Sequence, residues 1–368
     1  MSDAILRDLV ALNMTLRLSV ADYERLVAEL GSHEALRRAD TAALRRAGLP
    51  DRLAAEVARL LHSDKPDEEL RQADERDVAI IPFIDPAYPA LLRRIQDAPL
   101  VLYVEGQLED TDAVALAVVG SRRATHYGTD QAQRLSAECA ARGLTIVSGL
   151  AYGIDAAAHR GALDGGGRTL AVLGSGFAKL YPPENAPLAD EIAQHGALIS
   201  EFPIHTPPWP ANFKRRNRLI SGLSLGVLVV EAGFGSGALV TADWALDQGR
   251  EVFAIPGRVD RKLSRGCHLL IRQGARLVER SQDIIDGLGK VGETLAPPLP
   301  RPEAAPLELS DDEAKVLAAV PDEPIHIDAI ADAAGLPAHS VASLLMILEL
   351  KRAVTQLPGK LFVRKSPT

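Results

Sequence analysis

Between residues 114 and 278, short and almost wholly apolar runs alternate with amphipathic segments of ten or more residues. Seven runs follow this pattern: residues 114–119, 145–148, 169–173, 197–200, 226–230, 251–255 and 275–278. A strand that is apolar at nearly every position is buried on both faces, as in a parallel sheet covered by helices on either side. The pattern therefore predicts an α/β class protein with an extended Rossmann-like parallel sheet.

The segment before this region has a different periodicity. Over residues 3–62 the apolar positions recur at helical spacing, with breaks at Gly31 and Gly48, so four or five short helices are expected. Residues 63–77 are charged and polar, which is typical of a connector. Two short extended runs, residues 78–83 and 100–104, then lead into the sheet.

The segment after the sheet begins with five prolines within residues 297–306, a composition that favours an extended linker. Ser310 and the acidic residues after it form a good helix start. Helices are expected over 311–319, 328–334 and 338–350, followed by a hairpin over 353–363 that turns at Pro358 and Gly359. Three helices and a hairpin predict a winged-helix domain.

These patterns divide the chain into four parts. We expect a helical module over residues 1–65, a Rossmann-like domain over 78–290, a proline-rich linker over 291–309 and a winged-helix domain over 310–368.

Composition narrows the class of protein. Hydrophobic residues make up 47% of the chain and charged residues 24%, values close to those of an average globular protein. No apolar run reaches the length of a membrane span, and Asp3, Arg7 and Asp8 stand where a signal peptide needs an apolar core. Only Cys139 and Cys267 are present, which excludes a disulfide framework. A cytoplasmic protein that does not associate with membranes is expected.

The charge is distributed unevenly along the chain. The formal net charge is −8, but residues 114–290 carry 20 basic and 16 acidic side chains, a local excess of +4. An anionic ligand is therefore expected to bind the middle of the chain.

Ligands of an open parallel sheet bind beyond the carboxyl ends of the strands. Glycines follow three of the expected strands at Gly120, Gly149 and Gly174, where they allow close approach to backbone N–H groups at the start of the next helix. Tight turns and close packing are the alternative explanation for each glycine alone. The set together predicts phosphate binding.

Basic residues support the same interpretation. Arg122 and Arg123 follow the first strand and suit a bidentate grip on phosphate oxygens. Residues 214–218 (Lys-Arg-Arg-Asn-Arg) form a second basic site, for which a solvated helix face is the alternative. Lys179 adds a cation beyond the third strand.

A glycine-rich loop at residues 233–237 opens another helix and is expected to cradle a phosphate or a base. The same arrangement would serve a nucleotide-processing hydrolase, such as a phosphoribohydrolase, with Glu231 as its acid. No dinucleotide fingerprint, P-loop or nucleophile elbow is found, and no metal site emerges. Asp155 and His159 lie four residues apart and could share a helix face, but helix capping by Asp155 and a hydrogen-bonded His159 are the preferred explanation. The sequence therefore demands no catalysis.

Many ordered motifs of this chain resemble the DNA-processing protein A family, also called DprA or Smf. They include Val119-Gly120-Ser121-Arg122, Ser148-Gly149-Leu150-Ala151-Tyr152-Gly153-Ile154-Asp155, Leu173-Gly174-Ser175-Gly176, Tyr181-Pro182-Pro183-Glu184-Asn185, Arg216-Asn217-Arg218-Leu219-Ile220-Ser221-Gly222-Leu223, Ser236-Gly237-Ala238-Leu239-Val240-Thr241-Ala242 and Ile255-Pro256-Gly257. Two positions depart from the family pattern: Lys214 stands where proline is usual, and His268 where asparagine is usual.

The resemblance implies a protein without enzymatic activity, cofactor or metal. It implies binding of single-stranded DNA, protection of that DNA, and loading of the RecA recombinase in natural transformation and homologous recombination. It leaves open a weaker binding of duplex DNA. It also implies a homodimer formed through the Rossmann-like domain. The expected DNA-binding residues are Gly120, Ser121, Arg122, Arg123, Gly149, Gly174, Lys179, Lys214, Arg215, Arg216, Asn217, Arg218, Ser236 and Gly237.

Aromatic residues are scarce, at 4% of the chain, so few side chains are available to stack on bases. Phe177, Tyr181 and Phe213 are the candidates, although core packing is the better explanation for Phe213. The expected recognition helix over 338–350 carries no Lys or Arg, which favours a protein contact or a weak DNA contact for the winged-helix domain.

Overall fold

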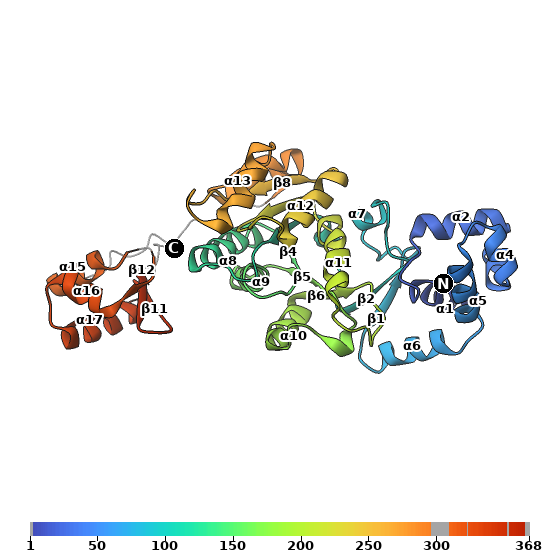
Figure 1. The fold of residues 1–368 in the computed structure, drawn as a ribbon, viewed down its shortest axis with the longest axis horizontal. Helices are drawn as coiled ribbons and strands as arrows, with labels where there is room; N and C mark the ends of the chain where they lie inside the picture. Colours follow the sequence, from blue (N-terminus) through green and yellow to red (C-terminus); the bar gives the residue numbers. More distant parts are fainter. Residues whose placement is uncertain (1–2, 296–308, 322, 352, 365–368) are drawn as a thin grey trace. The chain divides into compact units, whose positions relative to one another are not determined.

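The computed structural model describes residues 3–295, 309–321, 323–351 and 353–364. The chain divides into two compact units, Met1–Pro298 and Leu299–Thr368. Figure 1 shows the elements of both units.

The first unit is built on a nine-stranded sheet with the order β1-β2-β6-β5-β4-β3-β7-β8-β9. The strands from β3 to β9 run parallel, whereas β1 and β2 add an antiparallel edge next to β6. Their bounds are β1 Ala79–Pro82, β2 Val101–Gly106, β3 Ala115–Val119, β4 Thr145–Ser148, β5 Thr169–Val172, β6 Gly196–Ser200, β7 Gly226–Val229, β8 Glu251–Ala254 and β9 Arg276–Leu277. Each expected run therefore contains a strand of this sheet.

Both faces of the central parallel strands are buried, and alternate side chains of these strands enter different cores. Ala115, Ala117 and Val119 of β3 belong to one core, and Leu116 and Val118 to the other. The first face is covered by α7 (Ala90–Arg93), α11 (Pro210–Gly222), α12 (Gly237–Asp247) and α13 (Arg265–Arg272), and the second by α8 (His126–Ala140), α9 (Ile154–Asp164), α10 (Ala186–His195) and α14 (Ser281–Gly287). This three-layer arrangement confirms the Rossmann-like α/β fold.

Short 3-10 helices occupy several connections. They are η1 Asp110–Ala113, η2 Phe177–Lys179, η3 Pro183–Asn185, η4 Lys262–Ser264 and η5 Gly289–Thr294. The last of these lies at the start of the expected proline-rich linker. Most of that linker falls outside the described residues.

Six helices precede the sheet: α1 Asp3–Asn13, α2 Val20–Leu30, α3 His33–Arg37, α4 Thr41–Arg46, α5 Asp51–Leu61 and α6 Lys65–Asp74. The expectation of a connector over 63–77 is wrong, because most of it is α6, in which Pro66 occupies the first turn. Apolar side chains of α1 and α5 share a core with the sheet. Asn13 also donates to the carbonyl of Glu201 (2.9 Å), so these helices are fastened to the sheet through buried contacts.

The second unit contains α15 Asp311–Ala319, α16 Ile327–Ala334 and α17 Ala338–Leu350 around a core of its own. A three-stranded sheet in the order β10-β12-β11 completes it, with bounds Ile325–His326, Leu361–Arg364 and Val354–Leu357. Ser310 and Glu313 form the expected capping box at the start of α15. The predicted winged-helix fold is confirmed.

Within the described residues no single helix is long and apolar enough to span a membrane. The helices α16 and α17 pass that test only as a pair bent by 105°.

Candidate nucleic-acid interface

A pocket of about 670 Å³ lies where the order of the strands reverses. The chain moves from β3 outward to β6 in one direction and from β7 outward to β9 in the other. Open α/β sheets bind ligands at such a switch point, beyond the carboxyl ends of the strands. The lining comes from the β3–α8 loop, the start of α9, the segment between η2 and η3, α11 and the start of α12. It includes Gly120, Ser121, Arg122, Arg123, Asp155, Tyr181, Phe213, Lys214, Arg216, Asn217, Ser236, Gly237 and Thr241.

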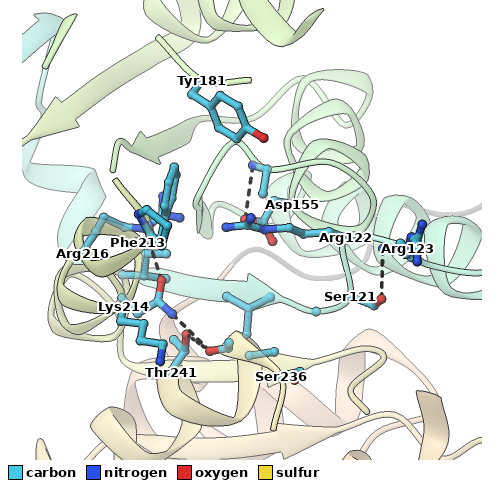
Figure 2. Close-up of a pocket in the computed structure, with 18 of the residues that line it drawn as sticks. Ser121, Arg122, Arg123, Asp155, Tyr181, Phe213, Lys214, Arg216, Ser236 and Thr241 are labelled. Atoms are coloured by element: carbon cyan, nitrogen blue, oxygen red, sulfur yellow. Dashed lines mark hydrogen bonds between the residues drawn. The ribbon is translucent and has the colours of Figure 1, made fainter. Parts of the chain in front are cut away.

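The loop after β3 brings two exposed guanidiniums to this pocket. A Cβ on Gly120 would lie 2.5 Å from Ile154, so only glycine lets the loop pass this close to α9. Ser121 then accepts a hydrogen bond from the backbone N–H of Arg123 (3.1 Å). Figure 2 shows Arg122 reaching toward Asp155, while Arg123 lies at the side of the site. The loop therefore presents Arg122 to a ligand in the pocket.

Arg216 supplies a cation from beneath the pocket. Its side chain is 2% exposed and donates to the carbonyls of Gly149 (2.8 Å) and Val172. A Cβ on Gly149 would lie 2.5 Å from the guanidinium, which explains the glycine after β4. Arg216 is thus held at the ends of β4 and β5 by main-chain carbonyls.

The pocket contains more positive than negative charge. Burial lowers the pKa of Arg216 to about 10, an effect that Asp155 opposes and Arg122 reinforces. Burial raises the pKa of Asp155, while Arg216 and Arg122 act to lower it. One carboxyl group therefore stands against two guanidiniums here, and the exposed Lys214 adds a further charge. An anion is the ligand that this arrangement favours.

An aromatic group borders these cations. The guanidinium carbon of Arg122 lies 5.0 Å from the centre of the Phe213 ring, and that of Arg216 lies 5.9 Å from it. Gly174 makes room for the ring, because a Cβ there would approach it to 2.6 Å. Tyr181 meets Phe213 edge-on at 5.7 Å between ring centres. Phe213 is half-buried and lines the pocket, so core packing, the explanation preferred from the sequence, does not by itself account for its position.

The start of α12 forms the opposite wall of the pocket. Asn217 donates to the carbonyl of Gly237 (3.1 Å), which ties α11 to α12. Ser236 is the N-cap residue of α12, and its buried hydroxyl has no hydrogen-bond partner among the described residues. Free N–H groups at a helix start attract anions, so Ser236 and Gly237 are placed where a phosphate would be bound.

Two arginines of the basic run face away from the pocket. Arg218 is 1% exposed and donates to both carboxylate oxygens of Glu201 (3.1 and 2.7 Å) and to Asp97 (2.7 Å). Arg215 pairs with Glu201 (3.0 Å) and also donates to the carbonyl of Leu16. The structure argues against both as phosphate ligands, since their charges are already paired within the fold.

Lys179 is exposed on η2 but does not line the pocket. Of the fourteen expected DNA-binding residues, the structure brings nine into the pocket lining. Gly149 and Gly174 are outside the lining, but their missing side chains leave room for Arg216 and Phe213. Lys179, Arg215 and Arg218 also lie outside the lining.

Glu231, the acid of the hydrolase alternative, has a structural role. Its carboxylate accepts hydrogen bonds from the backbone N–H (2.9 Å) and the hydroxyl (2.6 Å) of Thr125, which precedes α8. Glu231 is buried and does not line the pocket. This geometry removes the support for Glu231 as a catalytic acid.

His159 is only partly hydrogen-bonded. Thr169 gives its hydroxyl proton to the carbonyl of Ile146 (2.8 Å), so His159 Nδ1 must donate to that hydroxyl oxygen (2.7 Å). The other ring nitrogen, Nε2, is then an acceptor, and it has no partner among the described residues. Burial, together with the charge of Arg216, lowers the pKa of His159 to about 3.

Sequence reasoning overlooked two aromatic residues beside the pocket. Trp209 is 60% exposed at the N-cap of α11, between Pro208 and Pro210, which both line the pocket. Tyr152 is 38% exposed and follows Ala151, another lining residue. The signal for Trp209 was its position five residues before the start of the basic run.

Among the described residues no group of three or more His, Cys, Asp or Glu side chains is arranged to hold a metal ion.

Comparison with known proteins identifies the family. The family model of DNA recombination-mediator protein A matches residues 79–289, and the model of the DprA winged helix domain matches residues 300–360. Protein Smf of Escherichia coli is 44% identical over 286 residues, which cover 76% of each chain. The putative DNA processing protein DprA of Mycobacterium tuberculosis is 46% identical over 69% of this chain and 66% of its own length.

Two solved structures agree with these matches. DNA processing protein A of Streptococcus pneumoniae superposes with a TM-score of 0.67 and 33% identity, covering 78% of this chain and 98% of that one. The protein of the same name from Helicobacter pylori is described for its unique single-stranded DNA binding mode. It superposes with a TM-score of 0.52 and 30% identity, covering 58% of this chain and 96% of that one. This chain therefore belongs to the DNA recombination-mediator protein A family.

Proposed function

We propose that this chain binds single-stranded DNA in the pocket at the switch point, protects it, and helps to load the RecA recombinase during natural transformation and homologous recombination. The proposal includes a homodimer formed through the Rossmann-like domain in the cytoplasm. It involves no catalytic step and no cofactor.

The observation that carries the proposal is the charge of the pocket together with its aromatic border. Arg122, Lys214 and Arg216 meet the start of α12 in one cavity, and a phosphate would contact guanidinium and backbone N–H groups at once. Phe213 and Tyr181 border the same cations. Phosphates next to exposed aromatic rings are a feature of single strands, whose bases are free to stack. The H. pylori relative is likewise described as a single-stranded DNA binder.

The pocket contributes few charges, so the expected salt dependence is moderate. Each phosphate neutralised on a single strand contributes about −0.7 to the slope of log K against log salt concentration. Because Arg122, Arg123, Lys214 and Arg216 line the pocket, we expect a slope of roughly −2 to −3 per protomer.

The test is a titration of a fluorescent single-stranded 30-mer at several salt concentrations, with a duplex of equal length and a mononucleotide as competitors. We expect tight, salt-dependent binding that the mononucleotide does not abolish. Arg122→Ala should weaken binding and make the slope less steep by about 0.7. Arg160→Ala removes an exposed arginine that does not line the pocket, and it serves as the control.

Failure to bind the single strand would refute the proposal. Equal effects of Arg122→Ala and Arg160→Ala would remove the pocket as the binding site. RecA loading is tested separately, by measuring whether the protein accelerates RecA filament formation on DNA coated with single-strand binding protein. A rate that is unchanged by the protein would refute that part.

A further inference from the structure

Tyr152 lies on the loop between β4 and α9, directly against the loop that carries Arg122. The next residue, Gly153, has a φ of +74°, and a Cβ there would lie 2.3 Å from the carbonyl oxygen of Ser121. That carbonyl also accepts a hydrogen bond from the backbone N–H of Ile154 (3.2 Å). The main chain of Tyr152 is therefore held firmly beside the β3–α8 loop.

The far end of the Tyr152 side chain is held as well. Its hydroxyl donates a hydrogen bond to the carboxylate of Glu184 on η3. This bond raises the pKa of Tyr152 to about 12 and lowers the pKa of Glu184. With both ends held, Tyr152 is still 38% exposed. An anchored, exposed aromatic ring loses little conformational freedom when a ligand stacks on it.

Tyr152 adds an aromatic residue beside the two, Phe213 and Tyr181, that line the pocket with its cations. Arg122 lies over Phe213, and Tyr181 meets Phe213 edge-on at 5.7 Å. Tyr181 is 40% exposed and lines the pocket, and Tyr152 directly follows Ala151, another residue of the same lining. Figure 2 shows Tyr181 on the side of the pocket away from Ser236 and Thr241. A strand whose phosphate sits at Arg122 would therefore find aromatic rings on this side.

We propose that Tyr152 is a base-stacking residue at the mouth of the pocket, that its ligand is an unpaired nucleobase of the bound strand, and that Glu184 is the positioning residue that holds its ring. This inference rests on the proposed binding of single-stranded DNA. It adds a subsite for bases beside the subsite for phosphates. Stacking accepts any base, so the subsite favours unpaired strands without selecting a sequence.

The first test compares Tyr152→Ala, Tyr152→Leu and Tyr152→Phe in titrations with a fluorescent single-stranded 30-mer. Stacking on one aromatic ring is worth about 1–3 kcal/mol, so Tyr152→Ala and Tyr152→Leu should each weaken binding by about five-fold or more. Tyr152→Phe keeps the ring and should weaken binding by less. The salt slope should stay as in the wild type, because no charge has been removed.

An oligonucleotide with abasic sites along its length makes the test specific. On this probe the wild type and Tyr152→Ala should bind equally well, because no base is present to stack. An equal loss on both probes, or a changed salt slope, would overturn the proposal, since Tyr152 would then act on the backbone or on the fold. Wild-type affinity of Tyr152→Ala for the intact strand would also overturn it.

The second test concerns Glu184. Glu184→Gln keeps an oxygen that accepts the hydroxyl proton, whereas Glu184→Ala removes it, and both remove the charge. We therefore expect Glu184→Ala to bind more weakly than Glu184→Gln in the wild-type background. The two should be equal when Tyr152 is alanine. A difference that persists in the Tyr152→Ala background would refute the positioning role.

The failure of this inference differs from the failure of the proposed function. If the wild type does not bind the strand at all, the function is wrong. If the wild type binds and Arg122→Ala weakens binding but Tyr152→Ala does not, the pocket is correct and only the base subsite is refuted.

Discussion

Arg218 is expected to stabilise the fold, whereas Arg122 is expected to bind the ligand. The substitution Arg218→Met keeps the length of the side chain and removes its charge. Glu201, itself 1% exposed, then loses two hydrogen bonds. Breaking a buried ion pair by removing one partner costs about 3–5 kcal/mol. The lower end applies here, because Arg215 still contacts the same carboxylate at 3.0 Å.

The expected loss is therefore about 3 kcal/mol in the free energy of unfolding. For a unit the size of Met1–Pro298, the unfolding entropy near 60 °C is about 0.6 kcal/mol/K, so Tm should fall by about 5 °C. The DNA affinity of the folded variant, measured well below Tm, should stay within about two-fold of the wild type. Its salt slope should not change, because Arg218 contacts no phosphate.

Arg122→Met is the matched substitution. Arg122 is exposed, so its replacement should change stability by no more than about 0.5 kcal/mol while weakening DNA binding. Calorimetry for Tm and fluorescence anisotropy for binding separate the two effects. A Tm of Arg218→Met equal to that of the wild type, combined with weaker DNA binding and a flatter salt slope, would refute the reasoning.

Three further predictions follow from buried or exposed rings and glycines. His159 has a pKa of about 3 in the folded protein and is neutral there, whereas in the unfolded chain it binds a proton below about pH 6.5. The free energy of unfolding should therefore fall by up to about 1.4 kcal/mol per pH unit below pH 6.5. Unfolding of the wild type and of His159→Asn at pH 7 and 5.5 checks this, and an equal loss of stability in the two proteins would contradict it. Gly174→Ala places a Cβ 2.6 Å from the Phe213 ring and should weaken DNA binding several-fold, whereas unchanged affinity would show that the position of the ring is irrelevant. Trp209 is 60% exposed beside the pocket, so single-stranded DNA should quench tryptophan fluorescence in the wild type but not in Trp209→Phe; quenching that survives the substitution would exclude Trp209 from the interface.

The sheet could be predicted from the sequence because its signal is local. A strand buried on both faces must be apolar at nearly every position, and a glycine must follow where a helix or a side chain comes close. Gly120, Gly149 and Gly174 were singled out for the close approach of a ligand to the backbone, whereas in the structure the space that a Cβ would need is filled by Ile154, Arg216 and Phe213. The helix α6 was missed because its sequence is mostly polar, with only Leu70 and Ala73 to pack against the core. The contact of Glu69 with the backbone N–H of Ile204 (2.7 Å) also holds it in place.

The basic run 214–218 shows where sequence reasoning ends. By itself, the sequence determined that these residues lie between two strands of a parallel sheet, on the part of the chain that carries excess positive charge. Successive residues of a helix point about 100° apart, so one helix turns Lys214 and Asn217 toward one side and Arg215 and Arg218 toward another. Only the tertiary structure decided which side faces the pocket, because the groups that accept hydrogen bonds from Arg215 and Arg218 come from distant segments of the chain. Glu201 follows β6, Asp97 precedes β2 and Leu16 follows α1, and no local pattern reports that folding brings them together.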